Sequence, residues 1–303
     1  MRVSLIGDTS YPYIPFQKIS SYHKHMGDTV GLDLPNPDLV YMSVMFTWNK
    51  PMMMGKKKLL EAQGVPVVIG GSGYDVKSDL LVKFAYQHPD PELYGHLDYC
   101  FGFITRGCVR RCSFCIVPQK EGIIRFMGYD WINKPKVVLY DNNLLAYKNH
   151  KQVLRYLAQE NLKVCFNQGL DIRLITESNA KLLADLDYRS LNFKVPRLYF
   201  AFDQYSPQMT MLVKQKIQIL NKAGIPSRHL MFYMIYGVEE NPLDSFNSLW
   251  LRYNVIKRLG AKPYPMNYRR GDRRYRLCHD LARWTIRRYD QFLSFSQYCE
   301  GLK

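Results

Sequence analysis

Over the first ninety residues, two patterns of apolar and polar positions alternate, one typical of strands and one typical of helices. Short apolar runs that are typical of buried strands lie at Arg2–Ile6, Leu39–Val44 and Val65–Ile69. Apolar residues recur with helical spacing between them, in Phe16–Met26 and Met52–Gln63. Strands that alternate with helices predict a small parallel α/β domain, which we place at residues 1–95. The prolines and charges of His88–Glu92 mark a linker to the next part.

A second and longer series of the same kind begins at residue 99. Its candidate strands are Tyr99–Thr105, Lys136–Asp141, Leu162–Gln168, Arg197–Asp203, His229–Tyr236 and Ala261–Met266. The helical patterns between them are Lys148–Glu160, Glu177–Leu186, Met209–Ala223 and Leu243–Leu259. This α/β order predicts a partial (β/α)6 TIM-type barrel over residues 96–270, with its chemistry at the carboxyl ends of the strands.

Polar residues gather where these predicted strands end. The clusters are Asp141, Asn142 and Asn143; Asn167 and Gln168; Asp203 and Gln204; and Gly237, Glu239 and Glu240. Because parallel strands place their carboxyl ends at one edge, the clusters mark the location of a site without assigning a role to any single residue.

Composition and charge narrow the classes of protein to which the chain can belong. The chain has 303 residues, of which 47% are hydrophobic, and this excludes a disordered or fibrous protein. Its net charge of +16 favours polyanionic partners. Twelve Lys or Arg against three Asp, a net charge of +9, fall within residues 251–290. We expect the tail, Gly271–Lys303, to form one helix with a basic face.

Three of the seven cysteines stand within eight residues, as Cys108, Cys112 and Cys115. The odd number and the crowding argue against a disulfide framework and for metal ligation in a reducing compartment. No apolar run is long enough to span a bilayer, and the start carries no signal core. We therefore expect a cytoplasmic protein with no membrane segment.

The C-x3-C-x2-C spacing fits an iron–sulfur cluster better than other metals. Three thiolates hold three irons of a [4Fe-4S] cubane and leave the fourth iron open for catalysis. The alternative is a structural zinc site, which needs a fourth protein ligand. Only Cys100 or His96 lies nearby, at the wrong end of a predicted strand.

These features resemble the radical S-adenosylmethionine (SAM) superfamily. The resemblance rests on the cysteine spacing, on Phe114 before the last cysteine, and on the place of the motif after the first barrel strand, and it covers Tyr99 to Tyr268. Ile116–Pro118 and Asn167–Arg173 are similar to an uncharacterised bacterial and phage subgroup, in which a cobalamin-binding-like α/β domain precedes the core.

The resemblance implies two cofactors, a [4Fe-4S] cluster on Cys108, Cys112 and Cys115 and a SAM molecule on the open iron. Reductive cleavage of SAM would give methionine and a 5′-deoxyadenosyl radical, which abstracts hydrogen from substrate. The superfamily's Gly-Gly-Glu stretch is replaced here by Asp141–Asn143. The SAM-binding residues expected by this comparison are Phe114, Asp141, Asn142, Gln168, Arg173, Gly237 and Glu240.

Several of these residues also have a purely structural interpretation. Arg173 and Asp171 fit an internal ion pair equally well, and Gly237–Glu240 fits a simple strand-to-helix turn. Gly70–Gly73 is a turn or a phosphate cradle. The Asp-x-His-x-x-Gly motif of cobalamin domains is missing, so we expect a degenerate domain in which cobalamin binding is unsupported, with His23 and His25 exposed.

The other four cysteines, Cys100, Cys165, Cys278 and Cys299, form no second triad. A methylthiotransferase of this superfamily carries three further cysteines ahead of its core, and here none precedes Cys100. We expect all four to be small buried hydrophobes.

The basic end admits several partners. Arginines interleaved with aromatic residues suit an RNA backbone, and they suit equally an acidic electron donor such as flavodoxin or ferredoxin, or a solvated helix face. The candidate contact residues are Arg269, Arg270, Arg273, Arg274, Arg287 and Arg288. RNA modification therefore competes with modification of a peptide or small metabolite, and with a non-catalytic zinc-containing nucleic-acid-binding protein. The oligomeric state stays open.

Overall fold

The computed structural model describes residues 1–302, which form two compact units. The first unit holds Met1–Gly102, Cys115–Gly122 and Tyr129–Lys134. The second holds Phe103–Phe114, Ile123–Gly128 and the chain from Pro135 onward. The chain thus passes between the units around the cysteine motif. Among residues 1–302, no helix combines the length and the apolar character that crossing a bilayer requires.

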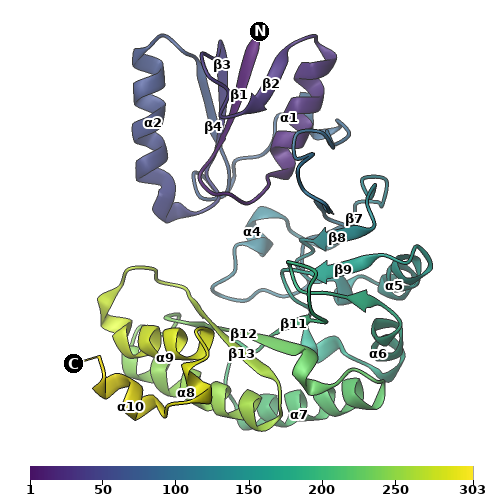
Figure 1. The fold of residues 1–303 in the computed structure, drawn as a ribbon, viewed down its shortest axis with the longest axis vertical. Coiled ribbons are helices and arrows are strands. Elements are labelled where there is room, and N and C mark those ends of the chain that lie inside the picture. Colours follow the sequence, from purple (N-terminus) through teal and green to yellow (C-terminus); the bar gives the residue numbers. More distant parts are fainter. Residues whose placement is uncertain (303) are drawn as a thin grey trace. The chain divides into compact units, whose positions relative to one another are not determined.

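The first unit is a parallel sheet between helices. Its strands, in the order β2-β1-β3-β4, are β2 (Thr29–Leu32), β1 (Arg2–Gly7), β3 (Leu39–Ser43) and β4 (Val67–Gly70). Helices α1 (Ile14–His25) and α2 (Lys50–Ala62) lie on opposite sides of it (Figure 1). Because side chains alternate along a strand, Val3 and Leu5 pack with Phe16 of α1, whereas Ile6 packs with Met53 of α2. The predicted α/β class is confirmed for this unit.

Glycines near the end of β4 have a structural role. Gly71 has a φ of +100°, and a Cβ there would lie 2.4 Å from the Val44 carbonyl oxygen. A Cβ on Gly73 would lie 2.5 Å from the carbonyl carbon of Phe46. The segment therefore packs against neighbouring backbone, and its glycines permit this close approach.

The prediction that His23 is exposed is wrong. Its side chain is 4% exposed, and its ring nitrogens contact Asp28 at 2.7 Å and the hydroxyl of Tyr41 at 3.1 Å. The histidine is buried because these two partners satisfy both of its nitrogens. His25, in the last turn of α1, is exposed as predicted.

The second unit contains two parallel sheets and the hairpin β6 (Thr105–Arg106) with β7 (Arg125–Phe126). One sheet includes β8 (Lys136–Leu139), β9 (Lys163–Phe166) and β10 (Asp187–Tyr188). The other consists of β11 (Leu198–Ala201), β12 (Leu230–Tyr236) and β13 (Lys262–Asn267). A parallel bridge between Leu170 and Phe200 joins the segment after β9 to β11.

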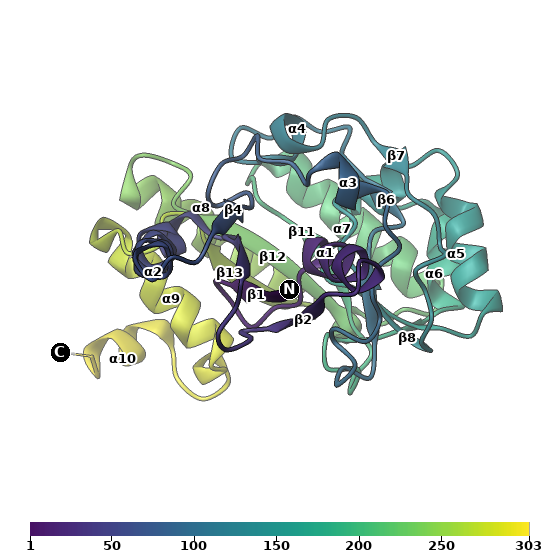
Figure 2. The ribbon, with the colours of Figure 1, turned by 90° about the horizontal axis from the view of Figure 1, so that it is seen from above.

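Helices follow the strands of this unit in turn. They are α5 (His150–Gln159), α6 (Glu177–Ala184), α7 (Pro207–Lys222), α8 (Pro242–Arg258) and α9 (Arg276–Ile286), and Figure 2 shows them one after another in an arc. Helix α8 packs on β12 and β13, and α9 packs on β13. The short elements of the chain are α3 (Val82–Ala85), β5 (Cys100–Gly102), α4 (Val117–Lys120) and α10 (Phe295–Glu300).

Two predicted elements are interrupted. The strand expected over Tyr99–Thr105 breaks between β5 and β6, because the amides of Ile104 and Thr105 turn to the carboxylate of Asp141. The single helix expected in the tail is wrong. Helix α9 ends before Arg288, which has a left-handed φ of 63°, and α10 starts anew at the capping box of Ser294 and Gln297.

Candidate functional site

Cys108 lies in a shell of hydrogen-bond donors in the second unit. Its Sγ accepts the backbone N–H of Arg110 at 3.3 Å and the side-chain amide of Asn143 at 3.5 Å. Asn143, which follows β8, is 3% exposed, and its Oδ1 is buried without a partner in the described part of the chain. Donors aimed at sulfur stabilise a thiolate, and an orphaned buried oxygen is expensive unless a ligand donates to it.

Asp171 ties the cysteine loop to the segment that follows β9. Its carboxylate accepts Arg110 Nε at 3.0 Å and Arg173 Nε at 2.6 Å, and the Asn143 amide approaches it at 3.4 Å. Burial alone would raise the pKa of Asp171, but hydrogen bonds and charge from Arg173 and Arg110 lower it below its usual value. The predicted pair of Asp171 and Arg173 is thus present, as an internal ion pair that also holds Arg110.

Asp141 holds the chain that leads to the motif. Its carboxylate accepts the amides of Ile104 at 3.1 Å and Thr105 at 2.5 Å, and the Thr105 hydroxyl at 2.6 Å. Burial raises the pKa of Asp141 to about 6, although these bonds oppose the shift. These partners all belong to the protein, so Asp141, a predicted SAM-binding residue, has a supporting position in the structure.

The remaining motif residues are half-buried. Cys112 and Phe114 belong to the second unit, and the charge of Cys112 contributes to a raised pKa of Arg173, after hydrogen bonding to Asp171. Cys115 belongs to the first unit, where its Sγ accepts the N–H of Val117 at 3.5 Å.

None of the seven cysteines forms a disulfide. Among residues 1–302, no three His, Cys, Asp or Glu side chains gather in a way that would hold a single metal ion. An iron–sulfur cluster does not need such a gathering, because each thiolate binds a different iron.

The other cysteines are distinct from the motif. Burial raises the pKa of Cys100, that of Cys165 to about 12 and that of Cys278 to about 11. Thiols that stay protonated are poor metal ligands. The interpretation as buried hydrophobes suits these three, whereas Cys299 is only half-buried.

The expected SAM residues at later strand ends have mixed surroundings. Gln168 is exposed beside Gly169, whose φ is +86° and which lies against Tyr199 and Tyr233. Asn142 is half-buried. Gly237 donates its N–H to Ser245 and accepts Arg269 Nε at 2.9 Å, so both of its backbone groups have internal partners.

Glu240, the last of the expected residues, is exposed. The carbonyls of Glu239 and Glu240 accept the Tyr275 hydroxyl, at 2.5 and 3.2 Å. These bonds join the loop after β12 to the segment that precedes α9.

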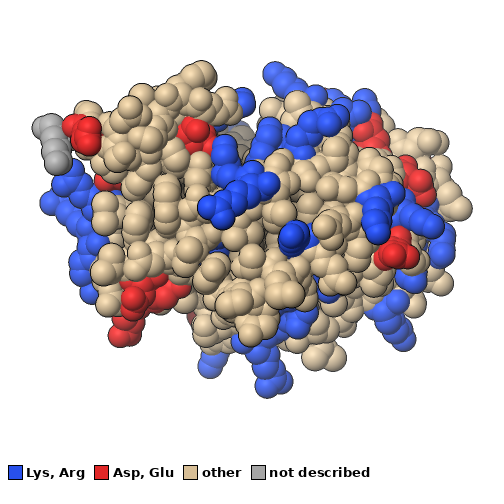
Figure 3. Space-filling model, turned by 90° about the horizontal axis from the view of Figure 1, so that it is seen from below, with Lys and Arg blue, Asp and Glu red and all other residues tan. Residues whose placement is uncertain are grey.

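The arginines of the basic end form two groups. Arg269, Arg270, Arg273 and Arg274 precede α9, whereas Arg287 and Arg288 follow it. An eleven-residue helix separates them by about 16 Å. All are exposed except Arg269, which is half-buried, and Arg274 pairs with Asp272 at 2.6 Å. Figure 3 shows Lys and Arg in several separate places on one face of the molecule, with few acidic residues between them.

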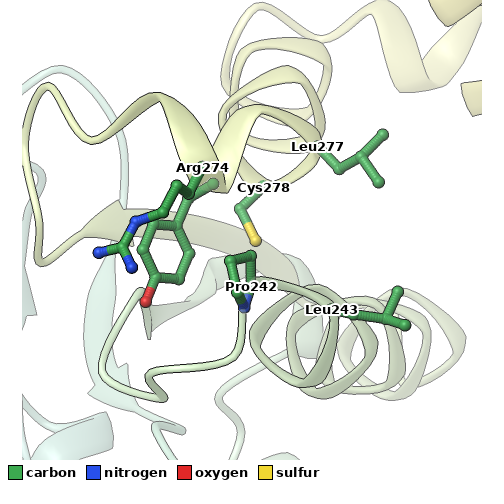
Figure 4. Close-up of a pocket in the computed structure, with 6 residues that line it drawn as sticks. Pro242, Leu243, Arg274, Leu277 and Cys278 are labelled. Carbon is green, nitrogen blue, oxygen red and sulfur yellow. The ribbon is translucent and has the colours of Figure 1, made fainter.

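A small cavity of about 190 Å³ lies in the helical part of the second unit (Figure 4). It is lined by Pro242, Leu243, Arg274, Tyr275, Leu277 and Cys278. Its lining is mostly apolar and contains none of the motif cysteines, so we assign it no part in the candidate site.

Sequence reasoning missed Arg110 and Asn143 as site residues. Arg110 lies inside the cysteine motif, and Asn143 ends the polar cluster after β8, so their positions were visible. Their importance follows from bonds to Asp171 and Cys108 that join residues 61 and 35 positions apart, which no local pattern displays.

The comparisons with known proteins give a fold. No family model and no curated protein matches the chain. A solved structure titled as the apo, selenomethionine-labelled form of the cobalamin-dependent S-adenosylmethionine radical enzyme OxsB matches with a TM-score of 0.52 and 13% identity. The match covers 78% of this chain and 49% of that one, so this chain spans about half the length of the solved chain. The α/β fold described above is thus similar to that of a radical SAM enzyme.

Proposed function

We propose that this chain is a radical SAM enzyme in which Cys108, Cys112 and Cys115 hold a [4Fe-4S] cluster. The observation that carries the proposal is the placement of the first motif cysteine. Its sulfur is bonded by two N–H donors at the carboxyl edge of β8, beside the orphaned oxygen of Asn143. The similarity in fold to a radical SAM enzyme supports it.

The residues fit such a cluster in chemistry. Three half-buried thiols are supplied by one short loop, and N–H donors point at the sulfurs of Cys108 and Cys115. The guanidinium groups of Arg110 and Arg173 add positive charge near the loop, which would offset the negative charge of a thiolate-ligated cluster. When bound, the cluster and SAM together would supply a carbon radical for hydrogen abstraction.

The chain's own residues would position SAM. Asn143 Oδ1 is an acceptor that no donor reaches within residues 1–302, and it suits the ammonium group of the methionine part of SAM. Asp171 holds Arg110 and Arg173 in place, so the loop that carries Cys108 is anchored from the end of β9. We keep Phe114, Asn142, Gln168 and Arg173 as candidates for the rest of the SAM pocket.

A partial barrel is the finer fold that goes with this proposal. Strands β8, β9, β11, β12 and β13 are parallel to their neighbours, and the bridge of Leu170 with Phe200 connects the two sheets. Their polar strand ends would then share one edge, as barrel chemistry requires.

Cobalamin does not fit the first unit. Ligands of open α/β sheets bind at the carboxyl ends of the strands. His23 and His25 lie in the last turn of α1, which leads back to the start of β2, and His23 is buried with two partners. At the carboxyl end, Gly71 and Gly73 pack against backbone. We derive no step through cobalamin.

The proposal requires an external one-electron donor of the flavodoxin or ferredoxin type, in the cytoplasm. The exposed arginines before α9 offer opposite charge to such a donor.

Anaerobic reconstitution with iron and sulfide tests the proposal. We expect about four irons per chain and, with SAM and a chemical reductant, formation of 5′-deoxyadenosine. Cys108→Ala, Cys112→Ala and Cys115→Ala should each abolish both properties, whereas the matched control Cys299→Ala should keep them. About one zinc per chain with no 5′-deoxyadenosine would overturn the proposal in favour of the zinc-containing alternative.

A further inference from the structure

The sheet of β11, β12 and β13 has one closed face and one open face. Its closed face carries side chains that are fully buried: Leu198, Phe200, Leu230, Phe232 and Met234. Side chains alternate along strands, so the intervening residues form the open face. On that face Tyr233, Ile235 and Tyr264 are half-buried and Ala201 is exposed. Part of the face is therefore accessible.

Tyrosines cluster on the open face. The rings of Tyr199 and Tyr233 are stacked at 5.4 Å with 14° between their planes, and Tyr264 meets Tyr233 edge-on at 5.7 Å. The Tyr233 ring is held in place by its hydroxyl, which donates to the Asn167 carbonyl at 2.9 Å. Fixed aromatic rings on an accessible sheet are suited to stacking against planar groups.

Basic side chains stand where these three strands begin. Arg197 precedes β11, His229 precedes β12, and Lys262 opens β13. The register pairs Leu198 with Leu230 and Met231 with Lys262, so the three basic residues lie on adjacent strands. By the same alternation they share the face of the tyrosines.

This basic cluster lacks compensating acid within the described residues. Arg197 is 6% exposed, and its guanidinium bonds the carbonyl of Arg228 rather than a carboxylate. Burial, followed by the charges of Arg197 and Arg288, lowers the pKa of Lys262. His229 Nδ1 contacts the Tyr188 hydroxyl at 2.9 Å, and burial, followed by the charges of Arg228 and Arg197, lowers the pKa of His229, so its ring adds little positive charge. Buried Arg197 and exposed Lys262 thus bring two positive charges together, and an anion bound between them would relieve their repulsion.

The distance between the basic residues and the tyrosines indicates the size of the ligand. Lys262 and Tyr264 are two residues apart, which is about 7 Å along a strand. A phosphate held by the basic cluster would therefore leave an attached base over the tyrosines, within the reach of one nucleotide. Arginine and lysine are the usual phosphate partners, and tyrosine stacks on any base.

We propose that the substrate of this enzyme is a nucleotide unit, free or within a single strand, whose phosphate binds Arg197, His229 and Lys262 and whose base stacks on Tyr233 and Tyr264. That the bound nucleotide is a substrate rests on the proposed function. Its binding geometry stands on the second unit alone. The base would lie on the same sheet as Asp203, whose carboxylate accepts the Ile235 amide near the carboxyl ends of the strands.

Calorimetric titration of the full chain tests the inference without reductant or SAM. The probes are uridine 5′-monophosphate, uridine and a ten-residue oligouridylate, because uracil avoids the adenosine pocket expected for SAM. We expect uridine to bind about tenfold more weakly than its monophosphate. Lys262→Gln should weaken the monophosphate about tenfold and leave uridine unchanged, whereas Tyr264→Leu should weaken both. The exposed control Lys222→Gln should change neither.

The outcomes separate the sources of the nucleotide. Tight monophosphate binding indicates a free nucleotide, and binding of the oligouridylate alone indicates a single strand; both support the inference. Equal affinity for uridine and its monophosphate, binding of none of the probes, or an oligoglutamate that binds as well as the oligouridylate would overturn it. A protein that binds these probes but forms no 5′-deoxyadenosine would contradict the proposed function and leave the site standing.

Discussion

Asn143 donates its side-chain amide to the sulfur of Cys108 and leaves its own Oδ1 buried without a partner in the described chain. A buried oxygen in this state costs about 1 to 3 kcal/mol until a donor reaches it. The arrangement joins a proposed cluster ligand to a vacant acceptor, which is the pairing that a chelated cofactor with an amino group would need.

Asn143→Ala should therefore separate cluster loading from SAM binding. We expect iron content to persist and SAM affinity to fall about tenfold, since one charge-assisted hydrogen bond is lost. Equilibrium dialysis with SAM measures the affinity. Asn149→Ala, at an exposed asparagine before α5, is the control. Unchanged SAM affinity in Asn143→Ala would remove this residue from the pocket.

Asp171 should stabilise the second unit above acidic pH. Because its pKa is lowered in the folded state, its contribution is present above the unfolded value near 4 and is lost as the pH falls through the folded value. Asp171→Asn should lower the free energy of unfolding by about 2 kcal/mol at pH 7 and weaken this acid dependence. Denaturant titrations at several pH values measure both effects. An unchanged acid dependence would contradict the assignment.

Asp141 should act in the opposite direction. Its folded pKa is raised to about 6, so the folded state binds the proton more tightly. Its contribution therefore falls as the pH rises from about 4 to about 6, by about 3 kcal/mol in total. Asp141→Asn, which keeps an acceptor but cannot ionise, should flatten stability over this window. A slope that persists in the variant would point to another group.

Two glycines of the first unit provide a matched pair. Gly71 and Gly64 both have positive φ, at +100° and +79°, but a Cβ on Gly64 meets nothing within 4 Å. Gly64→Ala should cost about 1 kcal/mol from backbone strain alone. Gly71→Ala should cost at least about 3 kcal/mol, because its Cβ meets the Val44 carbonyl. Thermal unfolding of both variants measures the difference. Equal losses of stability would show that the segment around Gly71 relaxes to accommodate the added Cβ.

Arg252 should prove a major structural residue of the second unit. It is fully buried, and its guanidinium donates to the carbonyls of Phe202 and Ile235, each at 2.9 Å. Arg252→Met should lower the free energy of unfolding by about 3 kcal/mol, since both carbonyls lose a charged donor. Arg258→Met, at the exposed end of α8, serves as the control. Similar stabilities of the two variants would contradict this role.

Regular elements with apolar faces could be predicted from the sequence because their periodicity is local. Strand β12 was expected at His229–Tyr236 and runs from Leu230 to Tyr236, and α8 was expected at Leu243–Leu259 and runs from Pro242 to Arg258. Strand β2 escaped prediction because Thr29–Leu32 is short and only partly buried, so its pattern is weak.

Contacts distant in sequence could not be predicted. His23 is buried only because Asp28 and Tyr41 meet its two nitrogens. The strand ahead of the motif breaks because Asp141 captures two amides that lie 36 and 37 positions away. The three cysteines themselves are visible as a spacing, but the Asn143 amide that bonds Cys108 comes from the segment after β8.

The bond between Arg110 and Asp171 is complete with protein atoms alone. The loop that carries Cys108 is therefore held to the segment after β9 whether or not the proposed cluster is bound. In the proposed enzyme, loss of the cluster to oxygen would leave this attachment intact. Repair would then need only iron and sulfide supplied to an ordered loop, without refolding of the second unit.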